Sequence, residues 1–432
     1  MRRLSQLMRS SVFTPLAIAL AFVIRSFASL ERPIARFPDS LGYETFHLFG
    51  TIDRFWPVPF LYSLVTSDSG RVALHVIVGS IAWTWCALLL SKMSRYARTV
   101  LGAVLLLGLS PQVIRYDLAI LSESLGISFM VMAVAASINL HQRRTTTSIA
   151  LWITSISLCA MTRPAQLWIF LVVLAAPLWE FITSKGHRIT VTSVLTLILL
   201  LIGFLQLHEN SNTSALNFYT VLQDRVITNE ARLKWFADHG MPVSNEIRQA
   251  TGYDFAGQLP KEISDVIPLP IGQQPPSLMR VGGVALAKWV TADGWSTYIQ
   301  YVATHPHDSL SRLTSLTNAT LSPPNDDFLP LDNGPMIPRV LYGAWELWSA
   351  IGLGAIAIVF LKNRKAFSLF VGLTLSGFGV YAISMLTSGI EHPRHAVTSA
   401  VALRLIALSA IVIAMPKATQ KAKLDALDDE LA

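Results

Sequence analysis

The run SVFTPLAIALAFVIRSFAS, residues 11–29, is the first of a series of apolar stretches that decide the fold of this chain. A helix needs about 20 apolar residues to cross the roughly 30 Å hydrocarbon core of a bilayer. A signal peptide would carry an A-x-A-like cleavage site after such a run, and none follows, so we interpret the run as an uncleaved first span. Hydrophobic residues make up 52% of the chain and charged residues only 14%. The sequence therefore predicts an all-α polytopic membrane protein.

About ten runs of this kind occur along the chain, which predicts about ten transmembrane helices. Alternating them from a cytoplasmic N-terminus places every short basic loop on the cytoplasmic side, as the positive-inside rule requires, and places the C-terminus there too. The predicted spans lie near residues 11–29, 72–90, 98–113, 118–139, 148–162, 165–183, 190–208, 339–361, 366–387 and 396–415.

One long segment, 209–338, falls on the opposite side of the membrane. It carries 8 Lys and Arg against 13 Asp and Glu, so its net charge is opposite to that of the cytoplasmic loops. Its turn clusters and short amphipathic pieces predict an ordered, mostly helical extracytoplasmic insertion. The chain is thus divided into a transmembrane module (1–208, with a first outer loop at 30–70), the insertion (209–338), C-terminal transmembrane helices (339–415) and a cytoplasmic tail (416–432).

Composition also excludes some classes of function. The formal charge of +7 arises from short basic clusters between apolar runs, which is how topology signals are distributed, so no nucleic-acid partner is expected. Cys86 and Cys159 lie inside separate apolar runs and indicate neither a disulfide framework nor a zinc site. We expect a multi-pass protein of the plasma or inner membrane.

Polar residues gather at the outer ends of the predicted spans. A charged side chain within a membrane is costly and marks a functional site or an ion pair. Because these residues all fall on the same predicted face, they indicate one extracytoplasmic site. They are Asp39 in FPDSLGYE (37–44), Asp117 and Glu123 in RYDLAILSESLG, Arg163 in MTRPAQ, and Glu391, Arg394 and His395 in GIEHPRHA.

Five of these residues also have a purely structural interpretation. Asp39 fits an ordinary turn or helix cap, because Pro-Asp-Ser is common turn chemistry. Glu123 fits an intramembrane ion pair, and Arg163 and Arg394 fit interfacial anchors whose charged ends reach water. His395 fits an interfacial histidine with satisfied hydrogen bonds. It is their convergence on one face that favours chemistry.

The first outer loop is predicted to contain an interfacial helix. Residues 42–56, GYETFHLFGTIDRFW, place apolar side chains at helical spacing, and Trp56 with the following PVPFLY fits an aromatic anchor at the membrane surface. The deep charges Arg25 and Arg404 are predicted to be structural. The aromatic residues Trp289, Trp295, Tyr298 and Tyr301 are expected to pack the insertion rather than to stack on sugar.

The pattern of acid and cations suits a lipid phosphate at the interface. Guanidinium groups bind phosphate through bidentate hydrogen bonds and stabilise the charge that develops on a leaving phosphate. Arg394 and Arg163 are placed for both tasks. An acceptor hydroxyl that attacks a sugar must lose a proton, and Asp39 is placed to take it. One base with direct attack predicts inversion at the anomeric carbon.

These motifs together resemble the integral-membrane glycosyltransferases of the GT-C superfamily, in particular bacterial relatives of the protein O-mannosyltransferase and aminoarabinose-transferase group. The resemblance implies a polyprenyl-phosphate-linked sugar donor and an extracytoplasmic active site. It implies Asp39 as the general base, Asp117 or Glu123 as a second acidic position, and Arg394 on the donor phosphate with His395 beside it. Some members have an acidic pair where this chain has one acid, with Glu44 nearby, so no metal or other cofactor is expected.

The sequence therefore predicts a glycosyltransferase that uses a glycan, lipid or protein acceptor in the cell envelope. A transporter or flippase of lipid-linked sugars would also need phosphate-binding cations in a membrane groove, but its polar residues should line a path across the bilayer. A polysaccharide polymerase or ligase using outer-loop Arg and His is a third class, and it would not need Asp39.

Overall fold

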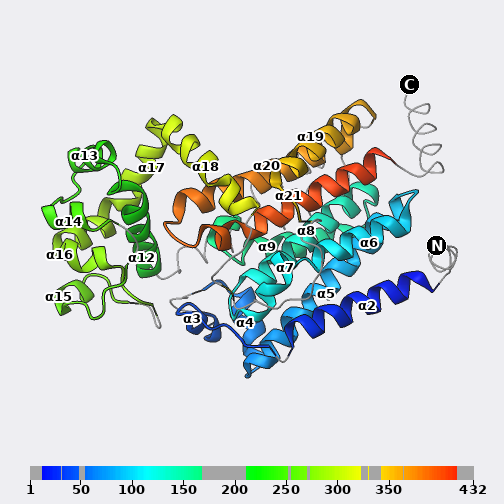
Figure 1. Ribbon diagram of the computed structural model, residues 1–432, viewed down its shortest axis with the longest axis horizontal. Coiled ribbons are helices and arrows are strands. Elements are labelled where there is room, and N and C mark those ends of the chain that lie inside the picture. Colours follow the sequence, from blue (N-terminus) through cyan, green and yellow to red (C-terminus); the bar gives the residue numbers. More distant parts are fainter. Residues whose placement is uncertain are drawn as a thin grey trace.

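The computed structural model describes residues 12–30, 32–47, 54–167, 211–251, 254–269, 273–322, 329, 342–362 and 364–415. Within these ranges the chain is helical, and its only β pairing consists of two isolated bridges. Figure 1 shows a bundle of long helices with a group of shorter helices at one end. The beginning of α2 and the end of α21 lie at the other end of the bundle.

The bundle is formed by the N-terminal and C-terminal parts of the chain. The N-terminal part contributes α2 (Phe13–Ser29), α3 (Ser40–Glu44), α4 (Pro57–Ser63), α5 (Asp68–Met93), α6 (Ala97–Gly108), α7 (Pro111–Ile114), η1 (Arg115–Leu118), α8 (Glu123–Gln142), α9 (Thr146–Ala160) and η2 (Pro164–Gln166). The C-terminal part contributes α19 (Trp345–Lys362), α20 (Arg364–Thr387) and α21 (His392–Ala414).

Five of the described helices are long and apolar enough to cross a membrane: α5, α8, α19, α20 and α21. A sixth candidate is the pair made of α6 and residues 111–118, which bends by 47° near Pro111, and α2 and α9 are shorter apolar helices. The chain is therefore a multi-pass helical membrane protein. The spans predicted at 165–183 and 190–208 lie, beyond Leu167, outside the described residues, so the total of about ten stays a prediction.

Helices α8 and α21 form the centre of the bundle. Both carry buried residues around their whole circumference, and α21 packs against α8, α19, α20 and α18 (Pro306–Leu321). Their sequences are apolar on every face, as expected for helices without a lipid or water side. The first turn of α8 and the first turn of α21 therefore meet inside the protein, and these turns carry Glu123 and Arg394.

Two local predictions in this region were wrong. The helix predicted over 42–56 ends at Glu44, because Thr45 is extended, and both Tyr43 and Phe55 are buried in the bundle core instead of facing the membrane surface. The span predicted to begin at residue 118 begins at Glu123, because the chain leaves η1 in an extended conformation at Ala119. Glu123 thus lies at the start of its helix and not a turn and a half into it.

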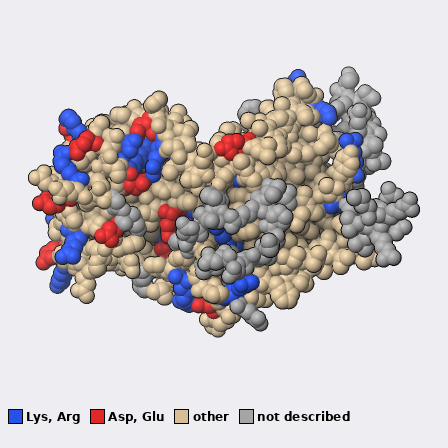
Figure 2. Space-filling view, viewed as in Figure 1, with Lys and Arg blue, Asp and Glu red and all other residues tan. Residues whose placement is uncertain are grey.

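The insertion has its own hydrophobic core. Phe218, Phe236, Trp289, Tyr298 and Tyr301 are buried in it, which agrees with the packing interpretation of its aromatic residues. Figure 2 shows mixed acidic and basic side chains over this part. Its elements are α12 (Ser211–Val221), η3 (Leu222–Val226), α13 (Glu230–Asp238), α14 (Asn245–Gln249), α15 (Lys261–Ser264), α16 (Ser277–Trp289), η4 (Val290–Gly294), α17 (Trp295–Thr304) and α18 (Pro306–Leu321).

A buried ion pair ties α2 to the segment before α8. Arg25 donates to both carboxylate oxygens of Asp117 at 2.8 and 2.9 Å, and Ser124 donates to Asp117 at 2.6 Å. Gly79 of α5 makes room for the guanidinium, since a Cβ at that position would lie 2.2 Å from Arg25 Nη2. The pair explains why two charges are tolerated inside the bundle: each satisfies the other.

We expect Asp117→Asn to destabilise the protein by about 3–5 kcal/mol, because it leaves the Arg25 charge buried without its partner. The matched control is Asp238→Asn, which removes an exposed partner of Lys234 and should change stability little. The measurement is thermal unfolding of both purified variants and the wild-type protein in the same detergent. Equal effects of the two substitutions would contradict the structural role of Asp117.

Candidate active site

Asp39 is positioned by backbone pairing between the loop after α2 and the loop before α8. The Ala35 amide donates to Leu118 O at 2.9 Å, and the Ile120 amide donates to Ala35 O at 3.0 Å. The hydroxyl of Ser40 then donates to Ile120 O at 2.8 Å. Residues 35–40 are thus held against the start of α8, which brings Asp39 beside the first turn of that helix.

The Asp39 side chain is used for ion pairing and not for capping. Asp39 occupies the N-cap position of α3, but its carboxylate makes no capping hydrogen bond. One carboxylate oxygen accepts from Arg394 Nη2 at 3.0 Å, and the other accepts from Arg54 Nη2 at 3.0 Å and from Gln273 Nε2. The turn interpretation of FPDSLGYE therefore does not account for this side chain, which connects four separate segments of the chain.

Arg394 is shared by three carboxylates. Its Nε donates to Glu123 at 2.5 Å, its Nη1 to Glu391 at 2.6 Å, and its Nη2 to Asp39. The side chain is only 5% exposed, so the cation is removed from water and depends on these acids for its stability. Each of the three guanidinium nitrogens therefore donates to a different carboxylate.

The backbone at the start of α21 aims Glu391 at this arginine. Glu391 has φ 51° and ψ 36°, in the left-handed region that non-glycine residues seldom adopt, and it precedes His392 and Pro393 at the first positions of the helix. Such a conformation costs about 1–3 kcal/mol and persists where the surrounding structure enforces it. The ion pair with Arg394 is a contact that this conformation makes possible.

Arg163 holds His395 in one tautomer. Its Nη2 lies 2.6 Å from His395 Nδ1, and its Nη1 lies 3.3 Å from Glu123 Oε1. A guanidinium can only donate, so His395 Nδ1 accepts and the ring proton is on Nε2. Arg163 therefore links Glu123 of α8 to His395 of α21. The cluster as a whole contains three arginines and three carboxylates: Arg54, Arg163, Arg394, Asp39, Glu123 and Glu391.

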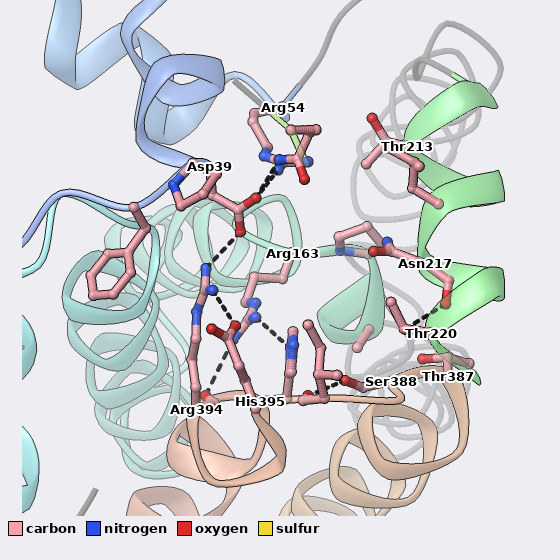
Figure 3. A pocket seen from close by; sticks show the side chains of 18 of the residues that line it. Asp39, Arg54, Arg163, Thr213, Asn217, Thr220, Thr387, Ser388, Arg394 and His395 are labelled. Carbon is pink, nitrogen blue, oxygen red and sulfur yellow. Dashed lines mark hydrogen bonds and ion pairs between the residues drawn. The ribbon is translucent and has the colours of Figure 1, made fainter. Parts of the chain in front are cut away.

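A cavity of about 240 Å³ lies against this cluster, and its two sides differ. In Figure 3 the charged side chains face helix α12 across the cavity. One side is charged and is formed by Asp39, Arg54, Arg163, Glu391, Arg394 and His395. The other side is uncharged and is formed by Thr213, Leu216, Asn217 and Thr220 of α12 together with Thr387 and Ser388.

The structure brings most of the predicted site residues together. Asp39, Arg163, Glu391, Arg394 and His395 line the cavity, and Glu123 lies behind Arg394, bonded to it.

Asp117 is elsewhere. It is fully buried on Arg25 and does not line the cavity, so of the two acids that the resemblance offered, Glu123 is the one that contacts Arg394. Glu44 also points to other partners, Arg36 and Arg71, each at 2.7 Å.

Sequence reasoning missed several lining residues. Arg54 lies inside the stretch predicted as an amphipathic helix. The sequence feature that could have indicated it is a basic residue between the acid and the aromatic pair of IDRFW. Gln273 follows no motif, and the polar face of α12 is recognisable only once α12 is known to border the cavity. Among the described residues no group of three or more His, Cys, Asp or Glu is arranged to hold a metal ion. The need for a cofactor stays untested.

The pKa values of Asp39 and Glu391 are shifted in opposite directions. Burial alone would raise the pKa of Asp39, but the charges of Arg54 and Arg394 and the hydrogen bond from Gln273 outweigh it and hold the pKa well below its usual value of about 3.9. Burial raises the pKa of Glu391, and the charge of Arg394 offsets only part of that effect. Asp39 is therefore the firmly ionised member of the pair.

Asp39→Asn should lower the melting temperature at pH 7. A carboxyl with a depressed pKa stabilises the fold above its unfolded pKa of about 3.9 and loses that contribution as pH falls through its folded pKa. The gap to the wild-type protein should therefore shrink as pH is lowered below about 4. Thermal unfolding in detergent across a pH series measures it.

Glu391→Gln provides the control of opposite sign. A raised pKa means that the charged form costs stability, so the contribution of Glu391 is present below its unfolded pKa of about 4.3 and lost as pH rises through its folded pKa. At pH 7 this variant should melt no lower than the wild-type protein. A fall as large as that of Asp39→Asn would show that the two acids are equivalent.

Comparison with known proteins finds only distant likenesses. No family model and no curated protein matches the sequence. Among solved structures, the oligosaccharyltransferase AglB of the archaeon Archaeoglobus fulgidus is similar in two forms. With an inhibitory peptide and a dolichol-phosphate it gives a TM-score of 0.37 at 13% identity, covering 91% of this chain and 50% of that one. In the apo form it gives a TM-score of 0.41 at 13% identity, covering 92% and 50%.

This chain spans about half the length of those enzymes. Because both TM-scores are below 0.5, we take the function from the site itself.

Proposed function

We propose that the protein is an inverting glycosyltransferase that moves a sugar from a polyprenyl-phosphate donor to an acceptor in the cell envelope, on the extracytoplasmic face. The observation that carries the proposal is the ion pair between Asp39 and Arg394, 355 positions apart in sequence, on the wall of one cavity. A base and a phosphate-binding cation in contact are the two parts that this reaction needs.

In the proposed reaction Arg394 and Arg163 bind the donor phosphate. Each nitrogen of Arg394 already donates to a carboxylate, and in this proposal the phosphate competes with the Asp39 carboxylate for Nη2. The side chains of Asp39 and Glu391 are 26% and 28% exposed, whereas that of Glu123 is fully buried, so Asp39 is accessible to such competition. When the phosphate replaces Asp39 on Arg394, Asp39 loses a contact that keeps it a weak base.

Asp39 then acts on the acceptor. Its carboxylate takes the proton of the acceptor hydroxyl while that oxygen bonds to the anomeric carbon. The bond from the anomeric carbon to the phosphate oxygen breaks, and its electron pair stays on the phosphate, where the arginines stabilise the added charge. The products are an inverted glycoside, a protonated Asp39 and polyprenyl phosphate.

The proposed orientation has support in the distribution of charge. In Figure 2 the end of the bundle farthest from the insertion shows Lys and Arg without accompanying Asp or Glu. By the positive-inside rule that end is cytoplasmic, and the cavity beside the insertion is then extracytoplasmic.

Transport of lipid-linked sugars is the weaker alternative, because the deep charges of the described residues do not form a path. Arg404 donates to the carbonyl oxygens of Leu321, Tyr342, Ala400 and Gly343, and Arg25 is paired with Asp117. These residues are structural, as predicted. A polymerase or ligase that uses Arg and His of the outer loops, without Asp39, leaves unexplained the three hydrogen bonds that hold Asp39 at the cavity.

We expect Asp39→Asn to lower sugar transfer by about 10²–10⁴-fold, the usual contribution of a general base, while donor binding is kept. Arg394→Gln should abolish donor binding. The matched control is Glu44→Gln, which changes an acid in the same eight-residue stretch that pairs with Arg36 and Arg71 and should leave transfer unchanged.

The assay follows release of farnesyl phosphate from synthetic farnesyl-phosphate-linked glucose by protein in lipid nanodiscs, with membranes of a strain lacking the protein as the acceptor source. Wild-type release by Asp39→Asn would overturn the assignment of the base. Passage of the labelled donor across sealed proteoliposomes without release of farnesyl phosphate would support transport instead.

A further inference from the structure

The uncharged side of the cavity is one face of helix α12. Thr213, Leu216, Asn217 and Thr220 are spaced i, i+3, i+4 and i+7, so their side chains lie on the same side of the helix. The opposite face of α12 carries Phe218 and Tyr219, which are buried in the core of the insertion. The polar face is therefore directed at the cavity by the packing of the insertion, as Figure 3 shows.

This face presents hydrogen-bonding groups that the described residues leave unused. Thr213 Oγ1 is buried and has no hydrogen-bond partner among the described residues. The Asn217 side chain is exposed and lines the cavity, and its side-chain amide makes no hydrogen bond to another described residue. Thr220 donates to the backbone at Asn217, which leaves its oxygen able to accept. A buried hydroxyl without a partner is costly and indicates a bound molecule or water.

The face carries no charge, although charged residues crowd the other side of the cavity. A sugar with a carboxylate or an amine turned toward α12 would bury that charge without a partner. A neutral sugar instead matches amide and hydroxyl groups with its own hydroxyls, and its C–H surface can pack on Leu216. The cavity volume of about 240 Å³ is below the roughly 300–1,000 Å³ of pockets for drug-sized ligands, which favours one ring over an oligosaccharide.

The distance between the two sides is set by a close backbone contact. Gly389, in the turn between α20 and α21, lies against the C-terminal half of α12, where a Cβ on Gly389 would be 2.0 Å from Thr220 O. The same turn carries Glu391 and leads to Arg394. A molecule whose phosphate is on Arg394 is therefore held at a defined separation from Asn217.

We propose that the α12 face formed by Thr213, Asn217 and Thr220 is the sugar subsite, and that it selects a single uncharged monosaccharide. The inference rests on the proposed function, because it takes the phosphate of the same donor to lie on Arg394. Two observations carry it: among the described residues, neither the hydroxyl of Thr213 nor the side-chain amide of Asn217 has a hydrogen-bond partner, and both lie opposite a charged wall.

The test uses three synthetic donors: farnesyl phosphate linked to glucose, to glucuronic acid and to 4-amino-4-deoxyarabinose, with farnesyl phosphate alone as the reference. Binding to the full-length protein in nanodiscs is measured directly, so the readout does not need the acceptor. The wild-type protein should bind the glucose donor at least about tenfold more tightly than either charged donor, since a charge buried without a partner costs that much or more.

Asn217→Ala and the nearly isosteric Thr213→Val should weaken binding of the glucose donor about tenfold, whereas farnesyl phosphate alone should bind to them as it binds to the wild-type protein. The matched control is Asn245→Ala, at an exposed position at the start of α14, which should bind all four ligands normally. Melting temperatures verify that the variants are folded, and Thr213→Val tests the face even if Asn217→Ala is unstable.

The outcomes separate the two proposals. Tight binding of a charged donor by the wild-type protein, or unchanged glucose-donor binding by both variants, would overturn the subsite while transfer of sugar still stands. Absence of binding by all four ligands, together with absence of farnesyl phosphate release, would overturn the proposed function and the subsite with it.

Discussion

The sharing of Arg394 by three carboxylates is the interaction on which this site depends. A guanidinium buried at the end of a membrane bundle must be neutralised, and here the acids come from the loop after α2, the start of α8 and the turn before α21. The cation therefore holds together segments from both ends of the chain. Each acid is positioned by its own backbone segment. The three carboxylates therefore surround Arg394 only when all three segments are in place in the folded protein.

The same chemistry appears twice in the bundle with different consequences. Arg25 and Asp117 form a closed pair, with both carboxylate oxygens occupied and both side chains buried, so their contribution is to stability. Around Arg394 the ion pairs border open space, one carboxyl has a depressed pKa and another a raised one. Access to a ligand, more than the presence of charge, distinguishes a site that can do chemistry from one that holds helices together.

The insertion completes the cavity. Tyr298 in its core donates to Leu386 O at the end of α20, and Gly389 allows backbone contact with α12. The uncharged face of α12 thus meets the arginine cluster of the bundle across a fixed gap. The bundle supplies charge and the insertion supplies neutral hydrogen-bonding groups, so the cavity combines two kinds of recognition that neither part provides alone.

The length and composition of the apolar runs were sufficient to predict a helical membrane protein, because a bilayer leaves few other ways to satisfy the backbone. The convergence of Asp39, Arg163, Glu391, Arg394 and His395 also followed from sequence, since alternating spans fix which ends share a side. Only the tertiary structure decided that Asp117 pairs with Arg25 while Glu123 pairs with Arg394, and that Arg54, Gln273 and α12 border the cavity. Those choices depend on side-chain distances between segments far apart in sequence, which helical periodicity and charge patterns do not specify.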